Sequence, residues 1–105
     1  MKKIECYIPQ HKFPQFQKAL REFGVHGMTV MDVRGFGNEQ TRPEPYLFLP
    51  KTKVEIFCQD EEVENVLATI SSCCKTGKLG DGKIIIYPIE EVMRIRTGER
   101  GKVAI

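Results

Sequence analysis

The sequence lacks a long apolar run, a strong charge of either sign and any paired-cysteine motif. No apolar stretch approaches the length needed to cross a bilayer, and the opening MKKIECYIP lacks the apolar core of a signal peptide. The 16 Lys and Arg residues nearly balance 14 Asp and Glu, so charge does not indicate a nucleic-acid or membrane surface. We therefore expect a cytoplasmic protein. Its 105 residues predict a single domain, small enough to gain stability from oligomerisation.

The cysteines do not form a pattern typical of metal binding or redox chemistry. There are four, with no C-x-x-C motif and no metal-ligand spacing, and a bridge between the neighbours Cys73 and Cys74 would be strained. Cys6, Cys58 and Cys74 instead continue apolar rows of the sequence. This pattern favours thiols in the core.

Residue alternation predicts a sheet. Three stretches alternate between apolar and polar residues, and a fourth is a short apolar run typical of a buried strand. These predicted strands cover residues 2–8, 28–35, 51–58 and 84–86. Residues 92–96 predict a further extended segment.

Two helices are predicted between the strands. The first has Pro14 in its first turn and ends at Gly24, with its apolar residues on one face. The second is expected to be capped by Asp60 and terminated by Gly77 in a left-handed conformation. The resulting order, βαββαβ, predicts a ferredoxin-like α+β fold in which two helices cover one face of an antiparallel sheet.

The stretch KTGKLGDGKIII, residues 75–86, matches a phosphate-binding loop in spacing alone. Gly77, Gly82 and Lys83 fit G-x-x-x-x-G-K, but Ile84 stands where that loop needs a Ser or Thr for magnesium. The predicted order is also helix to strand, whereas a P-loop runs from strand to helix and presents the helix N-terminus to phosphate. An anion here would be held by backbone amides, by Lys83 and by basic residues from elsewhere.

Basic residues follow in VMRIRTGER. On an extended segment, Arg94 and Arg96 would point to the same side and could grip a polyphosphate. The alternative is two solvated arginines. Because the strand between the glycine loop and this pair is short, we expect both to lie near one edge.

Three stretches of the sequence resemble the PII signal-transduction family. Residues 76–101 (TGKLGDGKIIIYPIEEVMRIRTGERG) are similar to its B-loop and C-loop signature, and residues 28–37 and 48–56 resemble the stems of its T-loop. The resemblance covers nearly the whole chain. It places a shortened T-loop at about 38–47, the B-loop at 76–83 and the C-loop at 94–101.

The resemblance implies a homotrimer that binds ATP, ADP or AMP in clefts between neighbouring subunits. The positions implied around the phosphates are Gly80, Asp81, Gly82, Lys83, Arg94 and Arg96. Those implied along adenine and ribose are Thr29, Gly35, Gly37, Glu55 and Phe57, and the nucleotide-binding set also includes Asn38 and Glu39. Glycine suits positions where the backbone must approach a ligand or adopt positive φ. For Thr29 and Glu55, an ordinary surface role is the alternative.

The segment NEQTRPEPYL, residues 38–47, departs from the family pattern. It is shorter than a typical T-loop, and Pro43 and Pro45 restrict its backbone. Tyr46 lies next to the LFLP stem and not at an apex, so we expect it to pack and not to be uridylylated.

The effector site of the family is also altered. Members that sense 2-oxoglutarate use a glutamine after GFG to coordinate Mg²⁺ beside ATP and a lysine in the FLPK stem to meet the effector. Lys51 matches the lysine, but Glu39 occupies the glutamine position and Gln40 follows one place late. A carboxylate facing the dianion at about 4 Å costs on the order of 4 kcal/mol per charge pair at an effective dielectric of about 20. This disfavours a classical nitrogen regulator, unless a register shift presents Gln40.

A smaller anion suits the shortened loop better. The sequence resembles divergent PII proteins that are associated with inorganic carbon and respond to bicarbonate. Amides near Gly37, together with Lys51 or Arg42, would hold such an ion. Glu39 and Gln40 complete the candidate effector set. Mg²⁺ and bicarbonate are therefore candidate ligands, and no cofactor is obligatory.

Three kinds of function fit these residues. A sensor would shift its loop with the adenylate it binds and so regulate a target protein, such as a transporter or an enzyme. A slow ATPase would need a catalytic base, but His11 and His26 lie apart without a Ser, Asp or Cys partner. The third kind of function is that of a structural trimer that binds no ligand, as in CutA-type proteins. We favour the sensor, with little preference for ATP over ADP or AMP, and expect no enzyme, no nucleic-acid partner and no membrane insertion.

Overall fold

The computed structural model describes residues 1–37 and 47–105 and forms a two-layer α+β domain. The candidate residues Asn38, Glu39, Gln40 and Arg42, and also Tyr46, lie outside these described residues. The elements in chain order are β1 (Lys2–Pro9), η1 (Gln10–Lys12), α1 (Phe13–Phe23), β2 (Thr29–Gly35), β3 (Leu49–Cys58), η2 (Asp60–Glu62), α2 (Val63–Cys74), β4 (Lys83–Pro88) and η3 (Gly101–Ala104).

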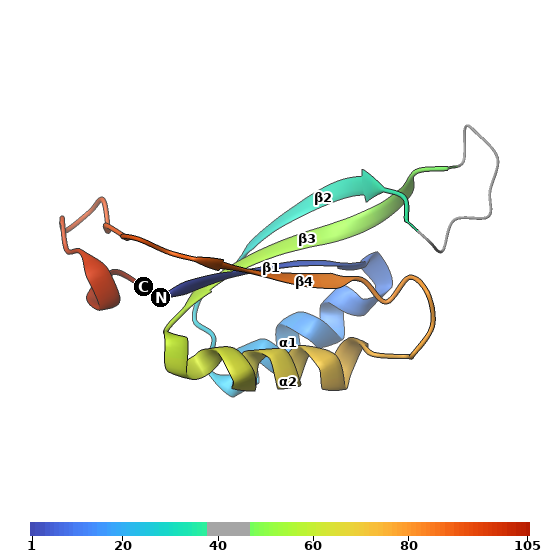
Figure 1. Cartoon of the computed structure of the whole chain (residues 1–105), viewed down its shortest axis with the longest axis horizontal. Helices are drawn as coiled ribbons and strands as arrows, with labels where there is room; N and C mark the ends of the chain where they lie inside the picture. Colours follow the sequence, from blue (N-terminus) through green and yellow to red (C-terminus); the bar gives the residue numbers. More distant parts are fainter. Residues whose placement is uncertain (38–46) are drawn as a thin grey trace.

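The sheet has the order β2-β3-β1-β4, and every neighbouring pair is antiparallel. Figure 1 shows α1 and α2 side by side on one face of this sheet, while the other face is open. The predicted ferredoxin-like fold is therefore confirmed. No helix within the described ranges is long and apolar enough to span a membrane.

The core lies between the sheet and the two helices. Alternate residues of β1 and β3 face inward and meet the apolar faces of α1 and α2. The fully buried side chains are Phe16, Ile4, Ile8, Leu20, Ile56, Val54, Val66, Cys6 and Cys58. Burial raises the pKa of the Cys6 and Cys74 thiols to about 12, so both stay protonated. The prediction that Cys6, Cys58 and Cys74 are core residues is confirmed.

The ends of α1 follow the sequence signals, but those of α2 do not. Gly24 ends α1 with φ +118°, as predicted. Asp60 does not cap α2, because its carboxylate accepts hydrogen bonds from the N-terminal amine at 2.7 Å and from Lys2 at 3.1 Å. Gly77 does not end α2 either, since the helix stops at Cys74 and the next residue, Lys75, is extended. The positive φ of Gly77, +83°, instead shapes the following loop.

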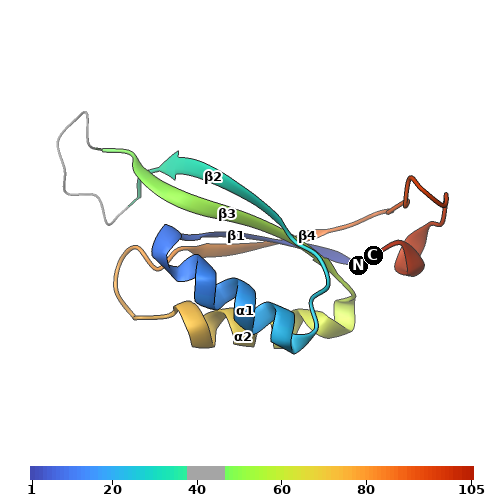
Figure 2. The same cartoon turned by 180° about the vertical axis from the view of Figure 1, so that it is seen from behind.

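The glycine loop and the C-terminal arginines lie at opposite ends of the sheet. Figure 1 and Figure 2 both show the α2–β4 connection at the same end as the β2–β3 connection, with the two termini at the other end. β4 covers Lys83–Pro88, and the chain continues past the sheet to Arg94. At about 3.3 Å per residue, the chain from Lys83 to Arg94 spans up to roughly 36 Å. The loop and the arginines both flank the edge strand β4, as expected, but they lie at its opposite ends and so are not close together.

The C-terminal residues form a hairpin and not the extended segment predicted for 92–96. Met93 bridges to Arg100, and the chain turns over residues 95–97. The amide of Arg94 donates to the Glu99 carbonyl and that of Gly98 to the Arg94 carbonyl, both at 2.8 Å. The strand alternation that placed Arg94 and Arg96 on one side is therefore absent.

Candidate functional site

A cleft of about 640 Å³ lies where the α2–β4 loop meets the ends of β2 and β3. It brings together seven of the predicted site residues: Gly35, Gly37, Lys51, Gly80, Asp81, Gly82 and Lys83. Among the described residues, four cations line it, namely Arg34, Lys51, Lys78 and Lys83, and one carboxylate, that of Asp81. A cleft lined by one sign of charge raises the local concentration of the opposite ion. This geometry suits a polyanion.

Asp81 shapes the loop that forms one wall of the cleft. Its carboxylate accepts hydrogen bonds from the amides of Thr76 at 2.8 Å and Gly77 at 2.9 Å, and also from the Thr76 hydroxyl. These bonds hold the pKa of Asp81 below its ordinary value. The carboxylate is committed to the loop's own donors, so the place of Asp81 among the phosphate ligands stays a prediction.

We predict that Asp81→Asn destabilises the protein at neutral pH but not in acid. A carboxylate whose folded pKa is lowered contributes stability above its unfolded pKa of about 3.9 and loses it as the pH falls through the folded value. Thermal melts of both proteins at pH 7 should therefore differ, and the gap should close as the pH drops below about 4. Asp32→Asn is the control, since the Asp32 side chain is exposed and makes no hydrogen bond or ion pair within residues 1–37 and 47–105. A gap that persists in acid would contradict this role.

Gly82 lets the loop lie directly on β1. It has φ +108°, and a Cβ added there would overlap the carbonyl oxygen of Tyr7, which also lines the cleft. Gly80 has φ +98°. Both positions therefore favour glycine, as expected, because other residues rarely adopt a positive φ.

The stems of the β2–β3 connection are joined by an aromatic pair. The rings of Phe36 and Phe48 meet edge to face with centroids 5.0 Å apart, and both side chains are more than half exposed. This contact fixes the two stems beside the cleft.

The remaining predicted adenine and ribose residues lie far from this cleft. Thr29 begins β2, whereas Gly35 ends it, so the two occupy opposite ends of one strand. Thr29 is opposite Glu55 on β3, and Phe57 is opposite Lys3 on β1. These positions belong to the end of the sheet nearer the termini.

Sequence reasoning missed a charged network on the open face of the sheet. Glu5 is only 4% exposed and accepts hydrogen bonds from the hydroxyls of Tyr7 at 3.0 Å and Tyr87 at 3.1 Å. Lys53 lies 3.4 Å from it, and Lys3 at 3.6 Å. Burial would raise the pKa of Glu5, but the two hydroxyls and Lys53 together hold it below its ordinary value. The sequence signal that could have indicated this network is the alternation of charged residues along β1 and β3, which places them on one face of the sheet.

Glu55 belongs to this network. Its carboxylate accepts a hydrogen bond from Lys3 at 3.0 Å. Glu55 is therefore neither the solvated surface residue nor a free ligand group in the single chain. Its role toward a nucleotide stays a prediction.

The two arginines of the C-terminal hairpin differ in their contacts. Arg94 donates to the Glu99 carboxylate and to the Val103 carbonyl, both at 2.8 Å, and so ties the hairpin to η3. Arg96 is exposed, and its side chain makes no hydrogen bond or ion pair with any other described residue. In this conformation Arg96 is the more accessible of the two for an external anion.

Fold and cleft together define a small ferredoxin-like protein with a cationic cleft at one end of its sheet. Residues 1–99 match the family described as "Nitrogen regulatory protein P-II". The chain is 45% identical to the nitrogen regulatory protein P-II of Rhodospirillum rubrum and 44% to that of Azospirillum brasilense, each over the full length of both chains. It is 46% identical to nitrogen regulatory protein P-II 2 of Methanothermobacter thermautotrophicus, across all of this chain and 97% of that one.

The chain belongs to the nitrogen regulatory protein P-II family. A regulatory, signal-transducing role follows at this coarse level, because the relatives are regulatory proteins by name. The alignment with the Rhodospirillum rubrum protein spans 112 positions, seven more than the 105 residues here. The shortened T-loop at about 38–47 stays a prediction.

Proposed function

We propose that the chain assembles as a homotrimer that binds ATP, ADP or AMP between neighbouring subunits and regulates a target protein through the β2–β3 loop. One observation carries the proposal. The residues implied for nucleotide binding divide into two groups at opposite ends of one sheet, so a single chain cannot bring them together. A neighbouring copy can.

The cleft suits the phosphates of an adenylate. The glycine loop supplies backbone amides, and Lys83 supplies a cation beside them. The first group consists of Gly35, Gly37 and residues 80–83, and Lys51 of the candidate effector set lines the same cleft. The second group, Thr29, Glu55, Phe57 and the C-terminal arginines, would come from the neighbour. Such head-to-tail contacts join unlike surfaces and close into a ring.

The open face of the sheet supports burial in an assembly. Phe57, Ile85 and Tyr87 are 47%, 37% and 40% exposed there, around the buried carboxylate of Glu5. A chain of this size buries a limited core alone. Covering these apolar side chains would stabilise a trimer.

Adenylate binding can be tested by thermal unfolding of the purified protein, with its trimeric state checked by light scattering. ADP, ATP and AMP are expected to raise the Tm, since a ligand at 100 times its Kd adds about 2.7 kcal/mol to stability. No shift from any adenylate at millimolar concentration on a verified trimer would contradict the proposal. Phosphate release well above background would instead favour an ATPase.

For the effector, we favour a small anion such as bicarbonate over 2-oxoglutarate. Lys51 lies in the cleft beside Gly37, while the other candidate effector residues lie outside the described residues. Calorimetric titration with bicarbonate and with 2-oxoglutarate, each with and without ADP and Mg²⁺, separates the two. Heat from 2-oxoglutarate alone would favour the classical nitrogen regulator.

A further inference from the structure

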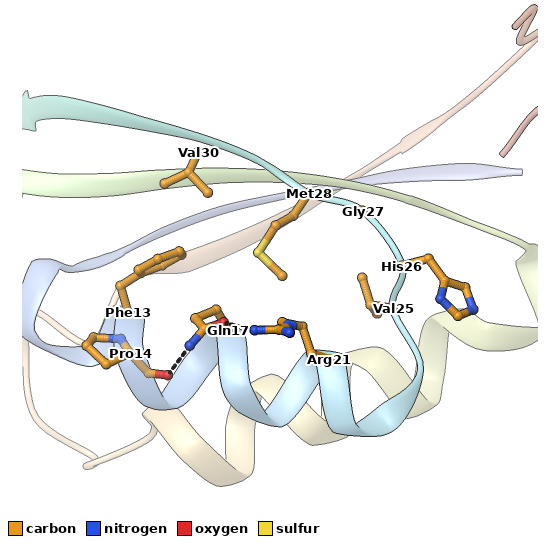
Figure 3. Close-up of a pocket in the computed structure, with 9 residues that line it drawn as sticks. All are labelled: Phe13, Pro14, Gln17, Arg21, Val25, His26, Gly27, Met28 and Val30. Atoms are coloured by element: carbon orange, nitrogen blue, oxygen red, sulfur yellow. Dashed lines mark hydrogen bonds between the residues drawn. The ribbon is translucent and has the colours of Figure 1, made fainter.

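A second cavity, of about 600 Å³, lies between α1 and the edge strand β2. It shares no residue with the cationic cleft. Figure 3 shows α1 below it, β2 above it and the connection between them at one side. Gly24 ends α1 in a left-handed conformation, and the chain then returns through residues 25–28 to β2. The cavity lies beside the outermost strand of the sheet.

The walls of this cavity are apolar. Phe13, Val25 and Met28 line it and pack against the hydrophobic core, so these walls are supported from behind. Val30 completes the wall on β2 and is 41% exposed. Its cross-strand partner, Val54, is fully buried against the helices. The cavity therefore presents apolar surface to solvent, beside a rigid layer.

The polar side of the cavity carries hydrogen-bond donors. Gln17, Arg21 and His26 line it, and no Asp or Glu from residues 1–37 or 47–105 does. In the described part of the chain, the only hydrogen bond or ion pair of the Arg21 side chain is a 3.4 Å hydrogen bond to Gln17. Figure 3 shows its side chain directed along α1 toward Gln17. A guanidinium without an anionic partner beside apolar walls is a site for a carboxylate.

We propose that this cavity binds a small monocarboxylate with an apolar body. The ligand carboxylate pairs with Arg21, whose planar guanidinium can donate two parallel hydrogen bonds to the two carboxylate oxygens. The apolar body lies against Phe13, Val25 and Met28. A single guanidinium favours one negative charge, whereas the four cations of the other cleft favour a polyphosphate. An apolar cavity with a few polar groups at one side is the usual form of a small-molecule site.

The proposal can be tested by titrating the ¹⁵N-labelled full chain with 3-phenylpropionate and following its amide resonances. The neutral 3-phenylpropanamide, which keeps the apolar body but lacks the charge, is the matched probe. We expect saturable shifts of the amides of residues 25–28, with the acid binding about tenfold or more tightly than the amide. Equal affinity of both probes, no saturation, or shifts confined to residues 78–83 would overturn the proposal.

Two variants on the same helix isolate Arg21. Arg21→Gln should weaken 3-phenylpropionate binding about tenfold or more, while Lys18→Gln, which removes a cation that does not line the cavity, should leave it unchanged. Both side chains are exposed, so the fold should persist, and the dispersion of the amide spectrum checks this. Unchanged affinity in Arg21→Gln would refute the pairing. Met28 and Val30 flank Thr29 of the proposed second group, so the titration contains no adenylate, and either proposal can then fail without the other.

Discussion

Mixing two variants that each bind adenylates poorly is expected to restore strong binding. Lys83→Gln removes one of the two loop cations that line the cleft, and Arg96→Gln removes the accessible guanidinium at the other end of the sheet. Each should lower ADP affinity about tenfold or more, since a hydrogen bond to a charged group contributes about 1.5–3 kcal/mol. If each cleft takes one group from each of two neighbours, random mixed trimers at equal ratio contain intact clefts at about a quarter of positions.

Isothermal titration of the unfolded and jointly refolded mixture measures this recovery. The control mixes Lys83→Gln with Lys83→Ala, which share one defect and should recover no strong sites. A mixture of Lys83→Gln and Arg96→Gln that also recovers none would contradict the division of the site between chains. Light scattering must show that both mixtures remain trimeric.

The second large effect is expected from Gly82→Ala. The new methyl group would overlap the Tyr7 carbonyl oxygen. Alanine at φ +108° also carries backbone strain, even where there is space for its side chain. Together these costs should destabilise the protein by at least about 2 kcal/mol, a fall in Tm of roughly 8–16 °C for a domain of this size. The loop should also move away from β1, and adenylate binding should weaken with it.

Gly77→Ala is the matched control for that change. Gly77 also has positive φ, +83°, but nothing lies within 4 Å of an added Cβ. Its substitution should cost only the backbone strain, about 1–2 kcal/mol. Comparing the two melts separates strain from collision. Equal losses in both variants would show that the close approach of Gly82 to β1 does not limit stability.

The elements of the fold could be predicted because local patterns determine them. Alternation predicted the strands, and Pro14 and Gly24 marked the ends of α1. Asp60 was mispredicted because the N-terminal amine and Lys2, distant in sequence, compete for its carboxylate. No local pattern reports a partner that lies 58 or 59 positions away.

The site was predicted in part. The glycine loop, the β2 end and Lys51 do meet in one cleft. The arginines were misplaced because the turn at residues 95–97 interrupts a segment whose apolar alternation resembles a strand. The buried position of Glu5 depends on Tyr7, Tyr87 and two lysines drawn from three strands. Such a network becomes visible only once the strand register is known.

The two groups of site residues lie at opposite ends of every chain, which has a consequence for mixed populations of the proposed trimer. In that proposed trimer, each protomer would border one cleft with its glycine loop and a different cleft with its C-terminal hairpin, because the two lie at opposite ends of the chain's sheet. A protomer damaged at both ends would therefore disable the cleft on either side of it, even between intact neighbours. Defective copies of this chain would act dominantly, and a minority of them would suppress signalling out of proportion to their abundance.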